Sequence, residues 1–177
     1  MRKAFTLLEV NLAILVMAGG ILSIVVFFSL GYRESSQSRE DVASAAYADR
    51  VLGPLVMGLS QLDLKWDDFD NLDNLPDDDG WGYYMDDNTG RVKSGAKSTA
   101  QTVYSKVMSI AQKGGNKGNL SSALPDMNGM TPGLVVRHDK GSGLVKIAFR
   151  ASRKESTLLS APLYYTEVRF QGKQKED

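Results

Sequence analysis

The sequence predicts an α+β protein in which a long N-terminal helix, first transmembrane and then amphipathic, packs against a C-terminal antiparallel sheet. Three observations predict this class. An uncharged apolar run covers residues 10–30, apolar residues then recur at intervals of three and four, and the last third holds three segments of alternating polarity. At 177 residues and 19.3 kDa, the chain can build one modest globular head beside a membrane segment.

The apolar run at residues 10–30 is long enough to cross a bilayer. It carries no formal charge, and as a helix it would be about 31 Å long, close to the thickness of a hydrocarbon core. Arg2 and Lys3 precede it, which predicts an N-terminus on the cytoplasmic side. Because the apolar core of a secretory signal peptide is only about 7 to 15 residues long, we expect this run to remain in the membrane.

Glu9 lies at the head of the apolar run. An ionised carboxylate at the edge of hydrocarbon is costly and usually has a partner or a function. The residues alone leave two interpretations open. Glu9 can be a charge at the helix N-terminus, placed at the headgroup boundary and stabilised by the helix dipole, or it can pair with a positive group.

The segment RKAFTLLE, residues 2–9, and the apolar run after it resemble the N-terminal signal of type IV prepilins and of the pseudopilins of type II secretion systems. The resemblance covers residues 2–30. It implies cleavage by a prepilin peptidase between Ala4 and Phe5, followed by N-methylation of Phe5. It also implies that Glu9 faces the N-terminal amine of an adjacent subunit. The carboxylate, which is energetically unfavourable in lipid, would then set the register between subunits during assembly.

Three positions depart from the usual pattern of this family. Ala4 stands where glycine is more usual before the cut, and Asn11 places an amide where such helices are commonly apolar. The proline that many pilins carry in this helix is replaced here by the pair Gly19-Gly20 as a source of local flexibility. Of these, Ala4 bears on the expected cleavage, because it lies directly before the cut. The resemblance also implies an organisation for the whole chain.

That organisation has four parts. We expect a leader peptide at residues 1–4, a transmembrane helix at 5–30, an amphipathic helical spine at 31–64 and a globular head at 65–177. The expected partners are the prepilin peptidase, other pilin or pseudopilin subunits and an inner-membrane assembly platform. The chain would cross the inner membrane once, with its head in the periplasm or outside the cell in the filament. An uncleaved, membrane-anchored periplasmic binding domain is the alternative.

An apolar stripe predicts that the helix continues beyond the membrane as the spine of the head. The stripe consists of Ala45, Ala48, Leu52, Leu55, Leu59 and Leu62. A second helix is predicted at residues 98–115, where Ser98 and Gln101 fit a capping box. Three strands are predicted at residues 133–138, 143–150 and 163–171, and the loop at 138–143 can join the first two as a hairpin.

The segment from residue 63 to residue 87 is rich in aspartate. The carboxylates are Asp63, Asp67, Asp68, Asp70, Asp73, Asp77, Asp78, Asp79, Asp86 and Asp87. Ca²⁺ prefers carboxylate and turn carbonyl oxygens, although the spacing here fits no EF-hand. Two interpretations stay open, namely solvated turns and a calcium site formed by Asp77, Asp79, Asp86 and Asp87.

Composition argues against most enzyme classes. The chain has no cysteine and one histidine, His138, which excludes disulfides, thiolate zinc sites and cysteine nucleophiles and disfavours a His-based triad. Lys and Arg number 21, as do Asp and Glu, so no basic excess indicates nucleic acid. We therefore expect a structural protein with no cofactor other than the calcium considered above. Trp66, Trp81, Tyr83 and Tyr84 can form either a binding surface or part of the core.

Overall fold

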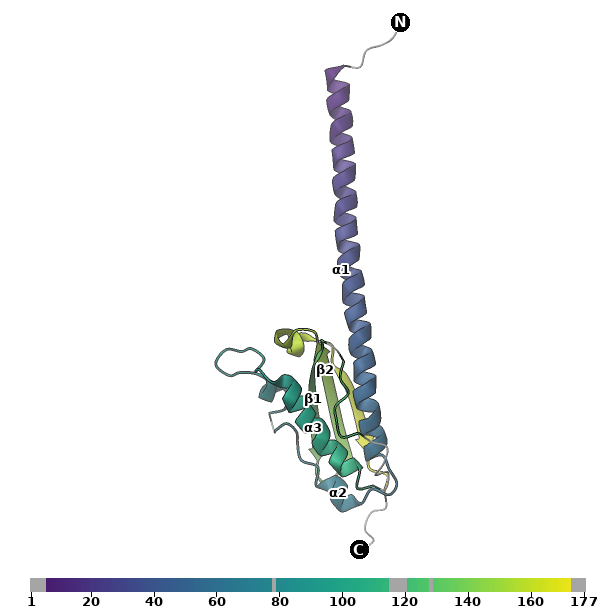
Figure 1. Ribbon diagram of the computed structural model, residues 1–177, viewed down its shortest axis with the longest axis vertical. Coiled ribbons are helices and arrows are strands. Elements are labelled where there is room, and N and C mark those ends of the chain that lie inside the picture. The colour runs from purple at the N-terminus through teal and green to yellow at the C-terminus, as the bar shows by residue number, and fades with distance from the viewer. Residues whose placement is uncertain (1–5, 78, 115–120, 128, 173–177) are drawn as a thin grey trace. The chain divides into compact units, whose positions relative to one another are not determined.

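The computed structural model describes residues 6–77, 79–114, 121–127 and 129–172 (Figure 1). The chain divides into two compact units, and the boundary lies between Asp41 and Val42. The elements, in chain order, are α1 (Leu7–Leu59), α2 (Trp66–Asp70), the 3-10 turn η1 (Gly80–Tyr84), α3 (Ala96–Ala111), β1 (Thr131–Asp139), β2 (Leu144–Ser152), the 3-10 turn η2 (Glu155–Ser160) and β3 (Tyr164–Arg169). The predicted α+β class is confirmed.

Helix α1 contributes to both units. Its residues after Asp41 belong to the second unit and form the helical spine of the head. The spine was predicted to reach residue 64, but α1 ends at Leu59. The chain then turns, with the Leu64 backbone N–H donating to the Gln61 carbonyl, and this turn brings the Leu64 side chain into the core.

The buried face of the spine differs from the predicted stripe. The structure buries Ser44, Tyr47, Ala48, Val51, Leu55, Gly58 and Leu59. Of the predicted residues outside this set, Leu52 is partly buried, whereas Ala45 and Leu62 are exposed. The stripe is rotated because Tyr47 and Val51 bring more apolar surface to the core than Ala45 does. Tyr47 can be buried because its hydroxyl donates to the Pro125 carbonyl at 2.9 Å.

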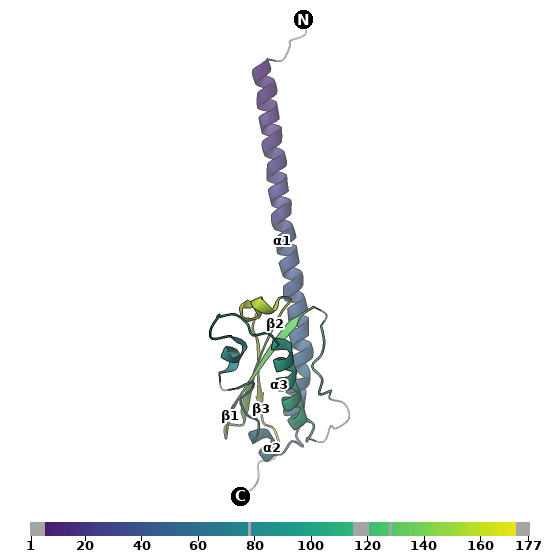
Figure 2. The same ribbon diagram turned by 60° about the vertical axis from the view of Figure 1, so that its left-hand side comes forward.

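In the described residues, β1, β2 and β3 form an antiparallel sheet in that order (Figure 2). All three predicted strands are confirmed, with slightly different bounds. The β1–β2 hairpin turns through Gly141 and Gly143, whose φ angles of 82° and 66° lie in the left-handed region that favours glycine. In the register, Val136 lies opposite Ile147, and Ile147 lies opposite Thr166.

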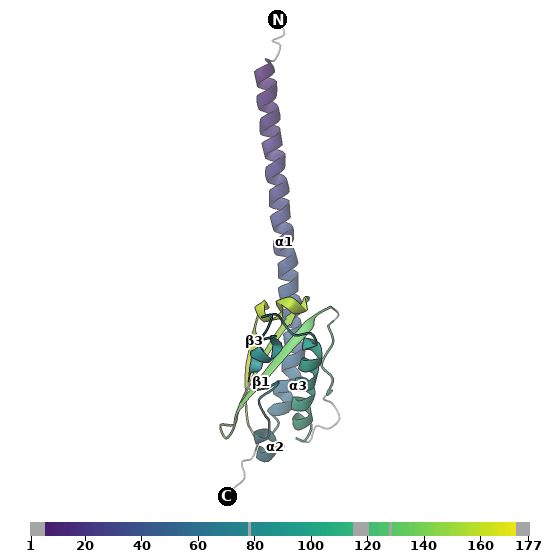
Figure 3. The ribbon, with the colours of Figure 1, turned by 90° about the vertical axis from the view of Figure 1, so that its left-hand side faces the viewer.

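One face of the sheet, the spine and α3 share a hydrophobic core. Alternate strand residues such as Val136, Ile147 and Phe149 are buried in it, as the period of a β-strand requires. Tyr47 of α1 meets Phe149 of β2 edge to face, with ring centroids 5.2 Å apart. Helix α3 runs beside β1 (Figure 3). Burying each large apolar side chain of this kind contributes about 1.5–3 kcal/mol.

The outer edge of β1 has its polar backbone groups satisfied. Pro132 has no N–H to expose. The Tyr84 hydroxyl donates to the Leu134 carbonyl at 2.9 Å and accepts from the Leu134 N–H at 3.0 Å. Val136 exchanges both backbone hydrogen bonds with Leu75. The edge is therefore closed against pairing with another strand at these positions.

Candidate functional site

Helix α1 begins with a capping box. The Thr6 carbonyl accepts the first intrahelical bond, from the Val10 N–H at 3.2 Å, so Thr6 is the N-cap residue. Its hydroxyl accepts from the Glu9 N–H at 3.3 Å. In return, one Glu9 carboxylate oxygen, Oε2, accepts from the Thr6 backbone N–H at 2.8 Å and from the Thr6 hydroxyl at 3.0 Å. This reciprocal pattern satisfies two N–H groups of the first turn.

The capping box supports the interpretation of Glu9 as a charge at the helix N-terminus. Sequence reasoning placed the carboxylate there but missed Thr6, although a threonine three residues before a glutamate is the signature of this motif. The predicted contact with the amine of a neighbouring chain stays a prediction. The predicted cleavage residues, Ala4 and Phe5, lie outside the described residues.

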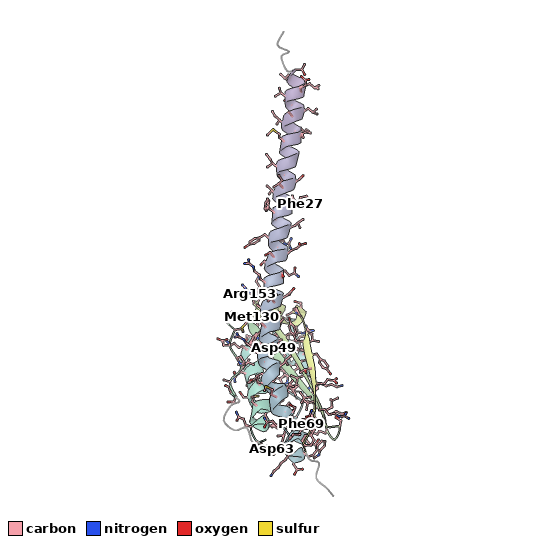
Figure 4. All side chains as sticks on the ribbon, turned by 90° about the vertical axis from the view of Figure 1, so that its right-hand side faces the viewer. Phe27, Asp49, Asp63, Phe69, Met130 and Arg153 are labelled. Atoms are coloured by element: carbon pink, nitrogen blue, oxygen red, sulfur yellow. The ribbon has the colours of Figure 1, made fainter. Side chains whose placement is uncertain are left out.

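The segment after Glu9 exposes apolar side chains on every side of the helix. Exposed large side chains in this stretch are Val10, Leu12, Ile14, Leu15, Val16, Met17, Ile21, Leu22, Ile24, Val25, Val26, Phe27, Phe28 and Leu30. Figure 4 shows the Phe27 side chain standing out from α1. By length and composition, α1 can cross a membrane, and such a helix near the N-terminus is either a membrane span or a signal sequence.

Small and polar residues interrupt this apolar surface at a few positions. The Asn11 side chain is exposed beside Leu7, Leu12 and Leu15. The Ser23 hydroxyl donates back to the Gly19 carbonyl at 2.8 Å, which satisfies it without a partner outside the helix. A methyl group added at Gly19 would meet nothing within 4 Å, so the glycine is not needed for packing inside the described part of the chain.

The Asp-rich segment forms turns and ion pairs. The Asp77 carbonyl accepts from the Arg137 guanidinium and from the Gly80 N–H, and Asp79 directly precedes η1. Asp86 Oδ1 accepts from the Asn88 and Thr89 N–H groups. Its pKa is lowered, chiefly by the Asn88 hydrogen bond, because these bonds stabilise the ionised form. Asp87 is exposed.

No group of three or more acidic or histidine side chains that could hold a metal ion occurs within the described residues. Asp78 lies outside them. Several other aspartates pair with cations from distant parts of the sequence, as Asp68 does with Lys113 at 2.9 Å and Asp73 with Lys140 at 3.2 Å. The local geometry thus accounts for these carboxylates as turn and pairing residues, and calcium binding stays a prediction.

His138 is buried in β1 and has a structural environment. Its Nδ1 lies 2.9 Å from the Leu72 carbonyl, so the proton sits on Nδ1, since a carbonyl can only accept. Its Nε2 lies 3.9 Å from Asp70 Oδ1, and Phe69 packs edge to face on the ring. A side chain enclosed in this way is not placed to act on a substrate as a general base.

The four aromatic residues of the sequence analysis do not gather into one surface. Trp66 packs on Phe69 and Phe170, whereas Trp81 packs on Tyr84 at the opposite face of the sheet. Tyr83, by contrast, is partly exposed, and the Lys93 ammonium lies over its ring. It lines a groove of about 230 Å³ together with Leu75, Pro76, Ser98, Thr99, Thr102, Val103 and Lys106.

Two candidate surfaces of the described residues are the apolar helix that begins at the Thr6–Glu9 capping box and the small groove at Tyr83. The architecture of the chain is pilin-like, with a hydrophobic N-terminal helix followed by an antiparallel sheet. The chain matches no protein-family model, no curated protein and no solved structure.

Proposed function

We propose that this protein is a structural subunit of a type IV pilus-like or type II secretion pseudopilus filament. The observation that carries the proposal is the first part of α1, which exposes apolar side chains on all sides and has the acidic residue Glu9 in its first turn. A surface of this kind needs lipid or other helices as its partner. The pilin-like order of helix and sheet supports the same conclusion.

In this proposal the apolar helix has two successive environments. It first anchors the chain in the inner membrane, with the N-terminus in the cytoplasm and the head in the periplasm. After removal of residues 1–4 by a prepilin peptidase and methylation of Phe5, an assembly platform transfers it into a filament. There the helices of neighbouring subunits replace lipid. The protein has no catalytic role in this scheme.

Glu9 sets the register between neighbouring subunits in the filament. The ammonium group on Phe5 of one subunit would meet the Glu9 carboxylate of the next, which neutralises both charges in a water-poor environment. We expect Glu9→Ala to insert into the membrane and to be processed, yet to be absent from filaments. Normal incorporation of this variant would show that the contact does not direct assembly.

The first test is the intact mass and N-terminal sequence of the protein extracted from its native membrane. A chain that begins at N-methylated Phe5 supports the proposal directly. A chain that begins at Met1, in cells with an active prepilin peptidase, contradicts it.

A second candidate function is an uncleaved, membrane-anchored periplasmic binding domain. The groove beside Tyr83 favours it, because this groove combines an aromatic ring with the hydroxyls of Ser98, Thr99 and Thr102 and the ammonium of Lys106. A chain that keeps Met1 would make this groove the first surface to examine.

A further inference from the structure

Three polar side chains, Asn11, Ser23 and Ser29, interrupt the uncharged run at residues 10–30. The Ser23 hydroxyl is satisfied within its own helix, because it donates to the Gly19 carbonyl at 2.8 Å. Asn11 and Ser29 are exposed, and neither side chain forms a hydrogen bond with any residue that the structure describes. Two polar groups of this run therefore have no partner in the described part of the chain.

Asn11 and Ser29 lie on the same face of α1, because the interval between them corresponds to about five helical turns. Residues on this face recur at intervals of four and three and form what we call the Asn11 seam: Asn11, Leu15, Ala18, Leu22, Val25 and Ser29. Two parallel helices can pack along a seam with this spacing, and the small side chain of Ala18 lets their backbones come close. Since the other faces of the run are also apolar, the polar groups rather than the spacing distinguish this face.

The Asn11 amide lies among apolar side chains, with Leu7, Leu12 and Leu15 beside it. In lipid, an amide without a hydrogen-bond partner is unfavourable. A carboxamide carries both donors and an acceptor, so the amides of two Asn11 side chains can satisfy each other across a helix pair. The group that best matches Asn11 is thus another asparagine at the same depth.

Membrane insertion brings the Asn11 residues of different copies of this chain to the same depth. Arg2 and Lys3 precede the apolar run and favour the same orientation for every copy. The length of the run, which is close to the thickness of a hydrocarbon core, then sets how deep each helix lies. A second copy therefore presents its Asn11 at the required depth, whereas an unrelated membrane helix does so only by coincidence.

We propose that the chain pairs with a second copy of itself in the membrane along the Asn11 seam, with hydrogen bonds between the two Asn11 amides. The inference rests on the membrane insertion in the proposed function and not on filament assembly. The same face of both copies forms this contact, so the pair closes after two chains, whereas the contacts of a filament are head to tail. The pair is thus a state of the chain in the membrane before assembly.

The absence of cysteine from the chain allows the contact to be mapped by disulfide formation between single introduced cysteines. Full-length variants are expressed in the native membrane of cells that lack the assembly platform, so that no filament forms, and are then treated with an oxidant. Leu15→Cys lies on the Asn11 seam. Val16→Cys is the matched control, because Leu15 and Val16 are 70% and 65% exposed but point about 100° apart around the helix. We expect a linked product of twice the mass of the chain from Leu15→Cys and much less of it from Val16→Cys.

The role of the amide is tested by second substitutions in the Leu15→Cys chain. Asn11→Leu keeps the run apolar but removes the amide, so the disulfide yield should fall about fivefold, the factor that corresponds to a hydrogen-bonded contact between membrane helices. Asn11→Gln keeps a carboxamide and should retain most of the yield. Ser23→Ala removes a polar group that is already satisfied within its own helix and should leave the yield unchanged.

Four results would overturn the inference. Equal yields from Leu15→Cys and Val16→Cys show that the helices have no preferred face, and an undiminished yield in Asn11→Leu shows that the amide does not hold the pair. An equal loss in Asn11→Gln and Asn11→Leu shows that the hydrogen bonds of a carboxamide are not what matters. A linked product of any other mass shows that the seam contacts a different protein.

The same samples separate this inference from the proposed function. Intact mass reports removal of the leader, so a chain that begins at Met1 contradicts the filament proposal while a disulfide-linked pair still supports the inference. A processed chain without a linked pair does the reverse. A chain that alkaline washing releases from the membrane contradicts both.

Discussion

The two parts of α1, before and after Asp41, have opposite exposure. Before Asp41, large side chains are open on all sides, with Leu15 70% and Phe28 76% exposed. After Asp41, one stripe of the helix is enclosed, and both Val51 and Leu55 are fully buried. The spine packs within its own unit, whereas the large apolar side chains of the first part are exposed. The difference shows that one part of the helix is buried against the head, whereas the other has the length and composition of a membrane span or signal sequence.

The largest expected effect is a difference between the two parts in how much a leucine contributes to the free energy of unfolding. Leu55→Ala removes a fully buried side chain from the core and should lower the free energy of unfolding of the head by about 2–5 kcal/mol. Leu15→Ala in the exposed part should change it by less than about 0.5 kcal/mol. Urea unfolding of the full chain in detergent, followed by the fluorescence of Trp66 and Trp81, measures both. Equal effects would contradict the division.

A second prediction concerns the loss of stability at alkaline pH, and it compares a tyrosine from each part of α1. Burial raises the pKa of Tyr47 to about 12, with a further contribution from Asp126. Because a free tyrosine ionises near pH 10, the unfolded chain loses this proton first. The stabilisation that neutral Tyr47 provides is complete below about pH 10 and is lost as pH rises toward 12.

Tyr47→Phe removes this pH dependence together with the hydrogen bond to Pro125, at a cost of about 1–2 kcal/mol at neutral pH. Tyr32, which is 79% exposed in the first part of α1, provides the matched control. Tyr32→Phe should leave the alkaline unfolding profile unchanged. Tyr84 also has its pKa raised to about 12 by burial, so the double variant Tyr47→Phe and Tyr84→Phe should flatten the profile further. An unchanged profile in Tyr47→Phe would show that the hydroxyl of Tyr47 is not enclosed.

A third, smaller effect concerns the start of α3, where a distant residue provides the cap. Glu155 Oε1 accepts from the Gly95 and Ala96 N–H groups, each at 3.0 Å. Glu155→Ala should destabilise the head by about 1 kcal/mol. Ser98 donates to the Gly95 carbonyl instead of accepting from an N–H, so Ser98→Ala should cost less. If Ser98→Ala destabilised the head more than Glu155→Ala, the capping box predicted from the sequence at Ser98 would be the real cap of α3.

The sequence predicted those features that depend on local pattern. The apolar run of α1, the helix now seen as α3 and the three strands each follow from the period of their own residues. The N-terminal position of Glu9 was also evident. Partners that are distant in sequence could not be predicted in this way. Glu155 lies about 60 residues from the α3 terminus that it caps, and the ion pairs of Asp68 and Asp73 reach Lys113 and Lys140.

The candidate site was predicted less completely than the fold. Thr6 was not predicted, although Thr6 and Glu9 together form a local motif that can be recognised from the sequence. The groove at Tyr83 could not be predicted, since it joins the Leu75–Pro76 segment to one face of α3. The rotation of the buried stripe on the spine also depends on a residue that is distant in sequence. Burial of Tyr47 depends on a partner for its hydroxyl, here the carbonyl of Pro125, which lies 78 residues further along the chain.

The smallest expected effect tests the rotation of that stripe. Leu62 satisfied the predicted spacing but is 72% exposed beyond the end of α1, whereas Leu59, three residues earlier, is fully buried. Leu62→Ala should therefore change the free energy of unfolding by no more than about 0.5 kcal/mol, while Leu59→Ala should cost about 2–5 kcal/mol. Thermal unfolding of the two variants in detergent measures this contrast. A cost of more than about 1 kcal/mol for Leu62→Ala would mean that the helix continues past Leu59 and that the stripe read from the sequence is the buried one.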